Sequence, residues 1–172
     1  MSEHEEIEEH IHHAHEPFDK TVAGTMAIIA ATLAIVSVLG QHFNTEELLN
    51  QQKSSDQWAF YQAKKIRGYS AQEARDILLQ LKPGSDLAGS YGKDTAKEAK
   101  DAEAIQDKAK EYETESATAG RRSIRFHLGE VFLEIAIVLS SLAILTKQRL
   151  LFVGGAIGAA IGVLTAVTAY WA

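Results

Sequence analysis

Three long apolar segments, almost free of charge, constrain this 172-residue chain more than any other feature. They cover residues 21–40, 128–146 and 150–171. Only two of the forty Asp, Glu, Lys and Arg residues fall within them, and both are glutamates of the second segment. An α-helix needs about 20 predominantly apolar residues to cross the hydrocarbon core of a bilayer. The three segments therefore predict three membrane-spanning helices rather than three buried helices of a soluble domain.

The predicted fold is an all-α integral membrane protein with three transmembrane helices and an extramembrane helical hairpin between the first and second. The first segment is expected to persist as an anchor, because acidic residues precede it and its apolar stretch is longer than that of a signal peptide. Between the second and third segments only Lys147, Gln148 and Arg149 remain, which predicts a tight turn. The predicted divisions are a histidine-rich acidic tail (1–20), the first transmembrane helix (21–43), the hairpin (44–120), the second transmembrane helix (121–146) and the third (150–172).

Composition excludes several classes of function. The chain has no cysteine, which excludes a cysteine-built metal site, a disulfide scaffold and a thiol nucleophile. It has no phosphate-binding glycine loop and no local catalytic signature, so an enzyme is not expected. Arg121, Arg122 and Arg125 fit a membrane-interface cluster better than a nucleic-acid site, because the remaining surface is not basic.

Helical patterns fill the region between the first two apolar segments. Capping residues and glycines predict helices from Asn44 to about Arg67, from Ser70 to the end at Pro83-Gly84, and from Asp94 or Thr95 to Ala119. Gly68 is the predicted stop of the first, and Gly84, Gly89 and Gly92 predict a flexible connection before the last. The simplest arrangement is an antiparallel hairpin whose arms are each about 35 Å long at 1.5 Å per residue.

Each arm of the hairpin carries a stripe of residues spaced alternately three and four apart, as in a coiled-coil seam. The stripe of the last arm is Ala102, Ile105, Ala109, Tyr112, Ser116 and Ala119. The stripe of the first arm is Leu48, Gln52, Ser55, Ala59, Gln62 and Ile66. Neither stripe is apolar enough for a large core, so we expect the hairpin to pack against copies of itself or another protein. A lone, marginally stable hairpin is the alternative.

The first arm also carries a recognisable motif. The stretch from Asn50 to Arg67, and most specifically Ser-Asp-Gln-Trp-Ala-Phe-Tyr-Gln-Ala-Lys from Ser55 to Lys64, resembles the signature of an uncharacterised bacterial membrane-protein family, domain of unknown function four-three-three-seven. The order of elements after Lys20 is also similar. The resemblance implies a membrane location and an all-helical fold, and it implies no known activity.

Ionisable residues gather on one face of the second apolar segment. His127, Glu130, Glu134 and Ser141 fall within about 60° on a helix at 100° per residue. A carboxylate inside a membrane is costly and usually faces protein or water. Three interpretations remain open: a hydrogen-bonded contact between helices, a proton or cation path lined by Glu130 and Glu134, and a contact with a lipid or ligand headgroup.

Small residues form a ridge on the third apolar segment. Gly154, Gly158, Gly162 and Ala166 are spaced four apart, so they share one helix face. Such a ridge lets another helix backbone approach closely in a membrane. The sequence predicts helix packing at this ridge and leaves open whether it occurs within one chain or between chains.

The N-terminal tail holds five of the seven histidines among several glutamates. Imidazole groups bind Zn, Ni or Cu, so His10, His12, His13 and His15 are candidate ligands for a divalent metal. Docking on a protein surface and a disordered tail are the alternatives. Apart from this metal, no cofactor is expected.

The favoured function is a non-enzymatic membrane protein that self-associates, or that is an accessory subunit of a larger membrane assembly. The alternative is an oligomeric proton or cation channel that uses Glu130 and Glu134. Expected partners are the lipid bilayer and either further copies or other subunits, and no nucleic acid. The expected location is the bacterial cytoplasmic (inner) membrane. Charge counts favour a cytoplasmic hairpin and C-terminus, and the reverse topology remains open.

Overall fold

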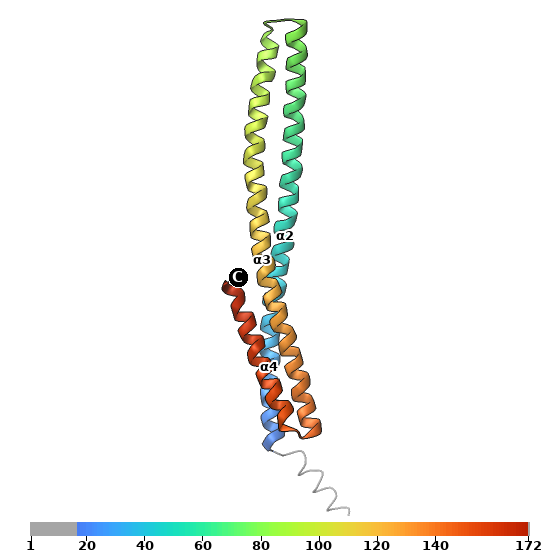
Figure 1. Cartoon of the computed structure of the whole chain (residues 1–172), viewed down its shortest axis with the longest axis vertical. Helices are drawn as coiled ribbons and strands as arrows, with labels where there is room; N and C mark the ends of the chain where they lie inside the picture. The colour runs from blue at the N-terminus through green and yellow to red at the C-terminus, as the bar shows by residue number, and fades with distance from the viewer. Residues whose placement is uncertain (1–16, 172) are drawn as a thin grey trace, which may run out of the picture. The chain divides into compact units, whose positions relative to one another are not determined.

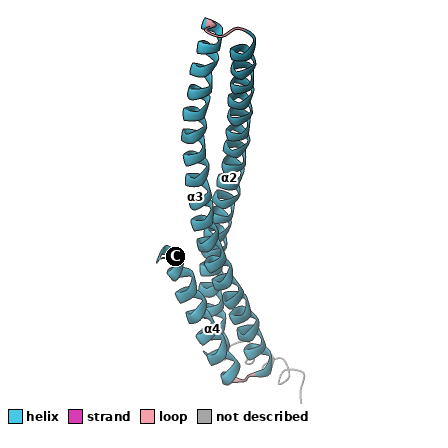
Figure 2. Cartoon of the chain, turned by 45° about the horizontal axis from the view of Figure 1, so that its top comes forward, coloured by secondary structure: helices cyan, strands magenta, loops and turns pink. Residues whose placement is uncertain are grey.

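The computed structural model describes residues 17–171, which form three α-helices and a short 3-10 helix. These are α2 (Pro17–Leu81), α3 (Asp86–Thr146), α4 (Arg149–Val167) and η1 (Thr168–Trp171). No strand occurs among the described residues (Figure 2). The prediction of an all-helical fold is therefore confirmed.

Two short turns join the helices. Gly84, between α2 and α3, has a φ angle of +83°, a left-handed conformation that glycine adopts without steric cost. The predicted turn at Pro83-Gly84 is thus confirmed. Lys147, between α3 and α4, also adopts a positive φ of 54°. Its turn is as tight as the sequence predicts, because α4 begins at Arg149.

The predicted helix breaks outside these turns are wrong. α2 continues through Asn44 and Gly68, and α3 continues from Asp86 through the glycines at 89 and 92. A glycine inside a helix costs about 1 kcal/mol relative to alanine, which packing can offset. At Gly68 the neighbouring arm lies close, since an added Cβ would be 3.7 Å from the Cβ of Glu98. Gly68 is therefore a packing position and not a stop signal.

The described chain divides into two compact units. The first, called here the three-helix unit, comprises residues 17–44 and 120–171 and includes α4 and η1. The second, the hairpin unit, comprises residues 45–119. Within the three-helix unit α4 lies alongside α2 and α3, and within the hairpin unit α2 and α3 run antiparallel, side by side (Figure 1).

A heptad pattern builds the core of the three-helix unit. From α2, Val22, Ile29 and Val36 are buried at intervals of seven residues. From α3, Phe126 and Leu133 are buried at the same interval. A seven-residue repeat keeps the same face of each helix against its neighbours when the helices supercoil. Alanines of α3 and α4 complete this core, together with partly buried leucines of α2.

Aromatic and charged side chains lie at both ends of the three-helix unit. At one end the Lys147 ammonium is 2.6 Å from Asp19 Oδ2, and Phe18 packs edge-on against Phe152. At the other end Phe43 stacks on Phe126, and Arg122 lies over the Phe43 ring. Between these ends, the exposed surface is dominated by aliphatic side chains.

The seam of the hairpin unit confirms one predicted stripe and corrects the other. The predicted stripe of α3 faces α2: Ala102, Ala109 and Ala119 are buried, and Ile105, Tyr112 and Ser116 are half-buried. The predicted stripe of α2 is wrong, because Leu48, Gln52, Ser55, Ala59, Gln62 and Ile66 are all exposed. The observed seam of α2 consists instead of Glu47, Asn50, Ser54, Gln57, Tyr61 and Lys64.

Hydrogen bonds explain why polar residues of α2 occupy this seam. The Ser54 hydroxyl donates to the carbonyl of Ala109 at 3.1 Å. From the opposite arm, the Ser116 hydroxyl donates to the carbonyl of Glu47 at 3.0 Å. Buried polar groups that form hydrogen bonds escape most of the desolvation cost. Small side chains with satisfied hydroxyls therefore fit the seam, while the larger apolar residues of α2 point outward.

Candidate functional site

The predicted ionisable face of α3 is only partly brought together. His127 and Glu130 are neighbours, with 3.1 Å between Nδ1 and Oε2. The Ser37 hydroxyl of α2 faces the Glu130 carboxyl, a contact that the sequence did not predict. Glu130 therefore has polar neighbours from two helices of the same unit. Ser37 is one of four hydroxyl residues in the apolar segment 21–40, and no pattern in the sequence distinguishes it from the threonines.

Glu134, unlike Glu130, has no polar partner within the described residues. Its side chain is exposed, and it forms no hydrogen bond or ion pair with any residue of the range 17–171. Ser141 is also exposed, two turns further along α3. Glu134 lies eight residues from Phe126 and twelve from Thr146, about 12 and 18 Å along the helix. An unpartnered carboxyl thus occupies the middle of the apolar outer surface of the three-helix unit.

The ridge of small residues on α4 packs against α3 of the same chain. A Cβ added at Gly162 would lie 2.8 Å from the carbonyl oxygen of Gly129. A Cβ added at Gly129 would lie 2.7 Å from the carbonyl oxygen of Gly162 and 3.0 Å from the Cβ of Ala166. Gly154 and Gly158 are less crowded, with their nearest atoms at 4.0 and 3.8 Å. The backbone contact is therefore closest at Gly162 and Ala166.

Ser140 occupies a second close contact between α3 and α4. Its side chain is fully buried, and its hydroxyl has no hydrogen-bond partner among the described residues. A Cβ added at Gly155 would lie 2.9 Å from this hydroxyl. Gly155, next to the predicted ridge of α4, therefore accommodates Ser140.

An ion cluster crosses the seam of the hairpin unit. The Lys64 ammonium lies 2.9 Å from Asp101 Oδ2 and 3.0 Å from Glu98 Oε2. The hydrogen bond to Asp101, and after it the ion pair with Glu98, raises the pKa of Lys64 above its ordinary value. The hydrogen bond from Lys64 lowers the pKa of Asp101. Charged groups in a helical seam often fix the register between helices, and this cluster suits that role.

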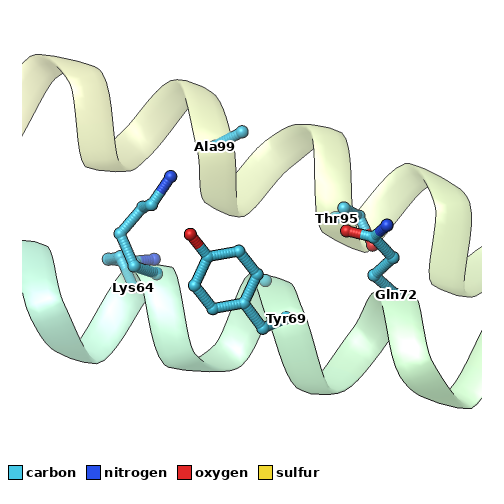
Figure 3. Close-up of a pocket in the computed structure, with 7 residues that line it drawn as sticks. Lys64, Tyr69, Gln72, Thr95 and Ala99 are labelled. Carbon is cyan, nitrogen blue, oxygen red and sulfur yellow. The ribbon is translucent and has the colours of Figure 1, made fainter.

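A cavity of about 150 Å³ opens beside this ion cluster. Figure 3 shows Lys64, Tyr69 and Gln72 rising from α2 and facing Thr95 and Ala99 of α3. Lys64 does not bring a net positive charge to the cavity, because its ammonium group pairs with the carboxylates of Glu98 and Asp101. Lys65 lies over the Tyr69 ring at 5.2 Å. Gly68 also lines the cavity, so we attribute the space to small residues in the seam.

The sequence motif of the first arm supplies contacts across the hairpin. The indole nitrogen of Trp58 donates to Glu113 Oε1 at 2.7 Å, and Trp58 packs edge-on against Tyr61. Lys64, at the end of the motif, enters the ion cluster. Phe60 remains exposed. The motif therefore holds the two arms together through Trp58 and Lys64.

The predicted metal ligands His10, His12, His13 and His15 lie outside the described residues. Within residues 17–171, no three or more His, Cys, Asp or Glu side chains are grouped to hold a metal ion. Metal binding by the tail therefore stays a prediction, which a titration with zinc would test.

Comparison with known proteins identifies the family. The family model described as Domain of unknown function (DUF4337) matches residues 18–172. The chain belongs to this family. The resemblance drawn from the motif at residues 55–64 is thus confirmed, while the bacterial and membrane attributes stay predictions. The family description assigns no activity. No curated protein and no solved structure matches the chain.

Proposed function

We propose that this DUF4337 chain is a multi-pass integral membrane protein whose three-helix unit lies in the bilayer. In the most apolar stretches of α2, α3 and the segment Arg149–Trp171, only 17%, 28% and 17% of the residues are buried inside the chain. Their outward surface includes Ile28, Val38 and Leu145, each more than half exposed. A soluble protein rarely exposes so large a continuous apolar surface, whereas lipid tails cover it readily.

The two ends of the three-helix unit support the same proposal. The residues from Phe126 to Thr146 span about 30 Å of helix, which matches the thickness of the hydrocarbon core. Charged and aromatic groups bound this length: Lys147 and Asp19 at one end, Arg122 and Tyr170 at the other. Aromatic rings and basic side chains with one apolar and one wet side suit a membrane interface.

The exposed residues of the hairpin unit support a role in assembly. With its seam formed by polar and small residues, α2 leaves Leu48, Ile66 and Ile77 exposed, at 56%, 64% and 58%. In our proposal the hairpin lies outside the bilayer, where no lipid covers these residues. We therefore propose a non-enzymatic protein that self-associates or serves as an accessory subunit of a larger membrane assembly. The observation behind this proposal is the exposure of Leu48, Ile66 and Ile77 on α2.

The test is the mass of the assembly extracted mildly from its native membrane. We expect a homo-oligomer or a mixed complex for the unchanged chain. Ile66→Glu should reduce that mass while helix content, measured by circular dichroism, stays unchanged. Leu87→Glu is the matched control, because Leu87 is also exposed but lies on α3. A monomer for the unchanged chain, or equal masses for all three, would contradict the assembly role.

For location, we propose the bacterial cytoplasmic membrane with the hairpin and C-terminus in the cytoplasm. The ion pair between Asp19 and Lys147 supports placing the start of α2 and the α3–α4 turn at one membrane face. Ser90→Cys supplies a single thiol at an exposed position in a chain without cysteine. We expect this thiol to resist a membrane-impermeant maleimide in intact cells. Labelling of this thiol in intact cells would mean that the hairpin lies on the outer side of the membrane and that the proposed topology is wrong.

An oligomeric proton or cation channel is the second candidate function. The contact between His127 and Glu130, with Glu134 one turn further along the same helix face, favours it. A path along this face would need neighbouring copies, because Glu134 has no partner among the described residues. Purified protein in liposomes should then conduct ions, and Glu134→Gln should abolish the flux. Absence of flux in the unchanged protein would remove this candidate.

A further inference from the structure

One face of α3 in the three-helix unit has no helix packed on it. Val131, Glu134, Val138, Ser141 and Leu145 are exposed and follow one another at intervals of three and four residues. These five residues are called here the outer stripe. The opposite face of α3 is occupied, since Phe126, Leu133 and Ala136 are buried in the core. The outer stripe thus has the spacing of a coiled-coil seam and lacks a partner helix.

Glu134 makes the outer stripe unsuitable as a surface for lipid alone. In the proposed membrane position, Glu134 lies about 12 Å along the helix from Phe126, where the span of about 30 Å begins, at 1.5 Å per residue. A glutamate side chain is too short to extend to the interface from that depth. An ionisable group at such a depth generally faces protein or water, because exposure to hydrocarbon is costly. The described residues of its own chain supply neither a hydrogen bond nor an ion pair.

Within the three-helix unit, the ridge predicted to pack with another helix is already used inside the chain. The ridge of small residues on α4 packs against α3, where added Cβ atoms at Gly129 and Gly162 would meet backbone oxygens below 3 Å. This ridge is therefore not available to a second molecule. Among the faces of α3 and α4, the outer stripe combines exposure with a polar group that requires a partner.

We propose that two copies of this chain pair along the outer stripe of α3, with the two Glu134 side chains in contact. This inference rests on the membrane location proposed above. Two copies inserted in the same direction and related by a two-fold axis along the membrane normal place the same residue at the same depth. Two carboxylic acid groups are self-complementary, because each hydroxyl donates to the carbonyl oxygen of the other. The second copy thus supplies the polar partner that lipid cannot.

Cysteine cross-linking tests this pairing directly, because the full-length chain contains no cysteine of its own. Val138→Cys introduces a thiol on the outer stripe. Ile135→Cys is the matched control, because Ile135 is exposed at a similar depth but lies about 100° from Glu134 around the helix. Under oxidation in native membranes, Val138→Cys should form a covalent dimer and Ile135→Cys should not. Equal cross-linking, or the reverse pattern, would overturn the proposed interface.

Substitution of the carboxyl provides a second test. A carboxamide in its place keeps reciprocal donors and acceptors, so Glu134→Gln should retain the dimer in lipid nanodiscs. Glu134→Leu should raise the dimer dissociation constant about threefold to twentyfold, the range given by single hydrogen bonds between membrane helices. Ile135→Leu is the control and should change nothing. A dimer as tight with Glu134→Leu as with the unchanged chain would overturn the role of Glu134.

The outcomes separate this inference from the proposed function. If Ile66→Glu lowers the assembly mass while the Val138→Cys variant fails to cross-link, the assembly role stands and the α3 interface is wrong. If the cross-link contains a different membrane protein, the outer stripe binds that protein and the homodimer is wrong. If the chain is not retained in membranes after alkaline washing, the proposed membrane function itself fails.

Discussion

At the scale of single residues, glycines determine how closely the helices of the three-helix unit approach. The backbones of α3 and α4 meet at Gly129 and Gly162, where a methyl group would lie within 2.8 Å of a carbonyl oxygen. Neither oxygen belongs to a flexible side chain that could move away. The sequence showed the ridge on α4 through its four-residue spacing. It did not show Gly129, because a single glycine carries no periodic signal.

The substitution Gly162→Ala should therefore destabilise the three-helix unit. Forcing a methyl group into a packed contact costs about 1–3 kcal/mol. Gly154→Ala is the matched control on the same helix, since its nearest atom would be 4.0 Å away. The free energy of unfolding in mixed detergent micelles measures both. Equal stabilities of the two variants would mean that the close contact at Gly162 is wrong.

The ion cluster of Lys64 gives the hairpin unit a defined pH dependence. The pKa of Asp101 is lowered in the folded chain, so its stabilisation is present above about pH 4 and is lost as the pH falls through the lowered pKa. The pKa of Lys64 is raised, so its stabilisation is present below about pH 10.5 and is lost at higher pH. Between these limits Lys64 and Asp101 are both charged.

The difference in melting temperature between the unchanged chain and Lys64→Gln should follow this pattern. We expect the difference to be largest from about pH 5 to 9 and to shrink at both extremes. Circular dichroism of the full chain across this range measures it. Lys65→Gln is the control, because Lys65 contacts the Tyr69 ring instead of a carboxylate. A difference that is constant with pH would contradict the ion cluster.

At the scale of secondary structure elements, the two arms of the hairpin show what the sequence can and cannot predict. The seam of α3 was predicted because its alanines leave one continuous small face among charged residues. The seam of α2 was not, because leucine and isoleucine were expected inside. Ser54 and Lys64 lie inside instead, where α3 offers them a carbonyl and two carboxylates. Those partners come from another part of the chain and cannot be read from α2 alone.

Glycines in the hairpin unit differ in role, and this difference is testable. Gly84→Ala should destabilise the hairpin by about 1–2 kcal/mol, because the φ angle of +83° is unfavourable for an L side chain. Gly89→Ala should stabilise it by up to about 1 kcal/mol, because Gly89 is helical and an added methyl group meets nothing. Thermal unfolding should show a lower melting temperature for Gly84→Ala and a higher one for Gly89→Ala. Equal shifts in one direction would contradict the assigned turn.

At the scale of the whole molecule, the mean hydropathy of −0.11 averages two unlike parts of the chain. The three apolar segments predicted the helices of the three-helix unit, because length and lack of charge are properties of the sequence itself. Which faces of these helices point inward could not be predicted from mean hydropathy, because nearly every face is apolar. The outward position of Glu134 became apparent only once Phe126, Leu133 and Ala136 were placed in the core.

The central claim is that the outer surface of the three-helix unit faces lipid, and depth-sensitive spin labelling tests it most directly. Single cysteines replacing Ile28, Ile135 or Ile157, all exposed, carry the label in liposomes, and Ser90→Cys is the hairpin control. We expect collisions of the first three labels with oxygen to dominate over collisions with a water-soluble nickel chelate, and the opposite at residue 90. Equal access of the nickel chelate to all four positions would contradict the membrane assignment.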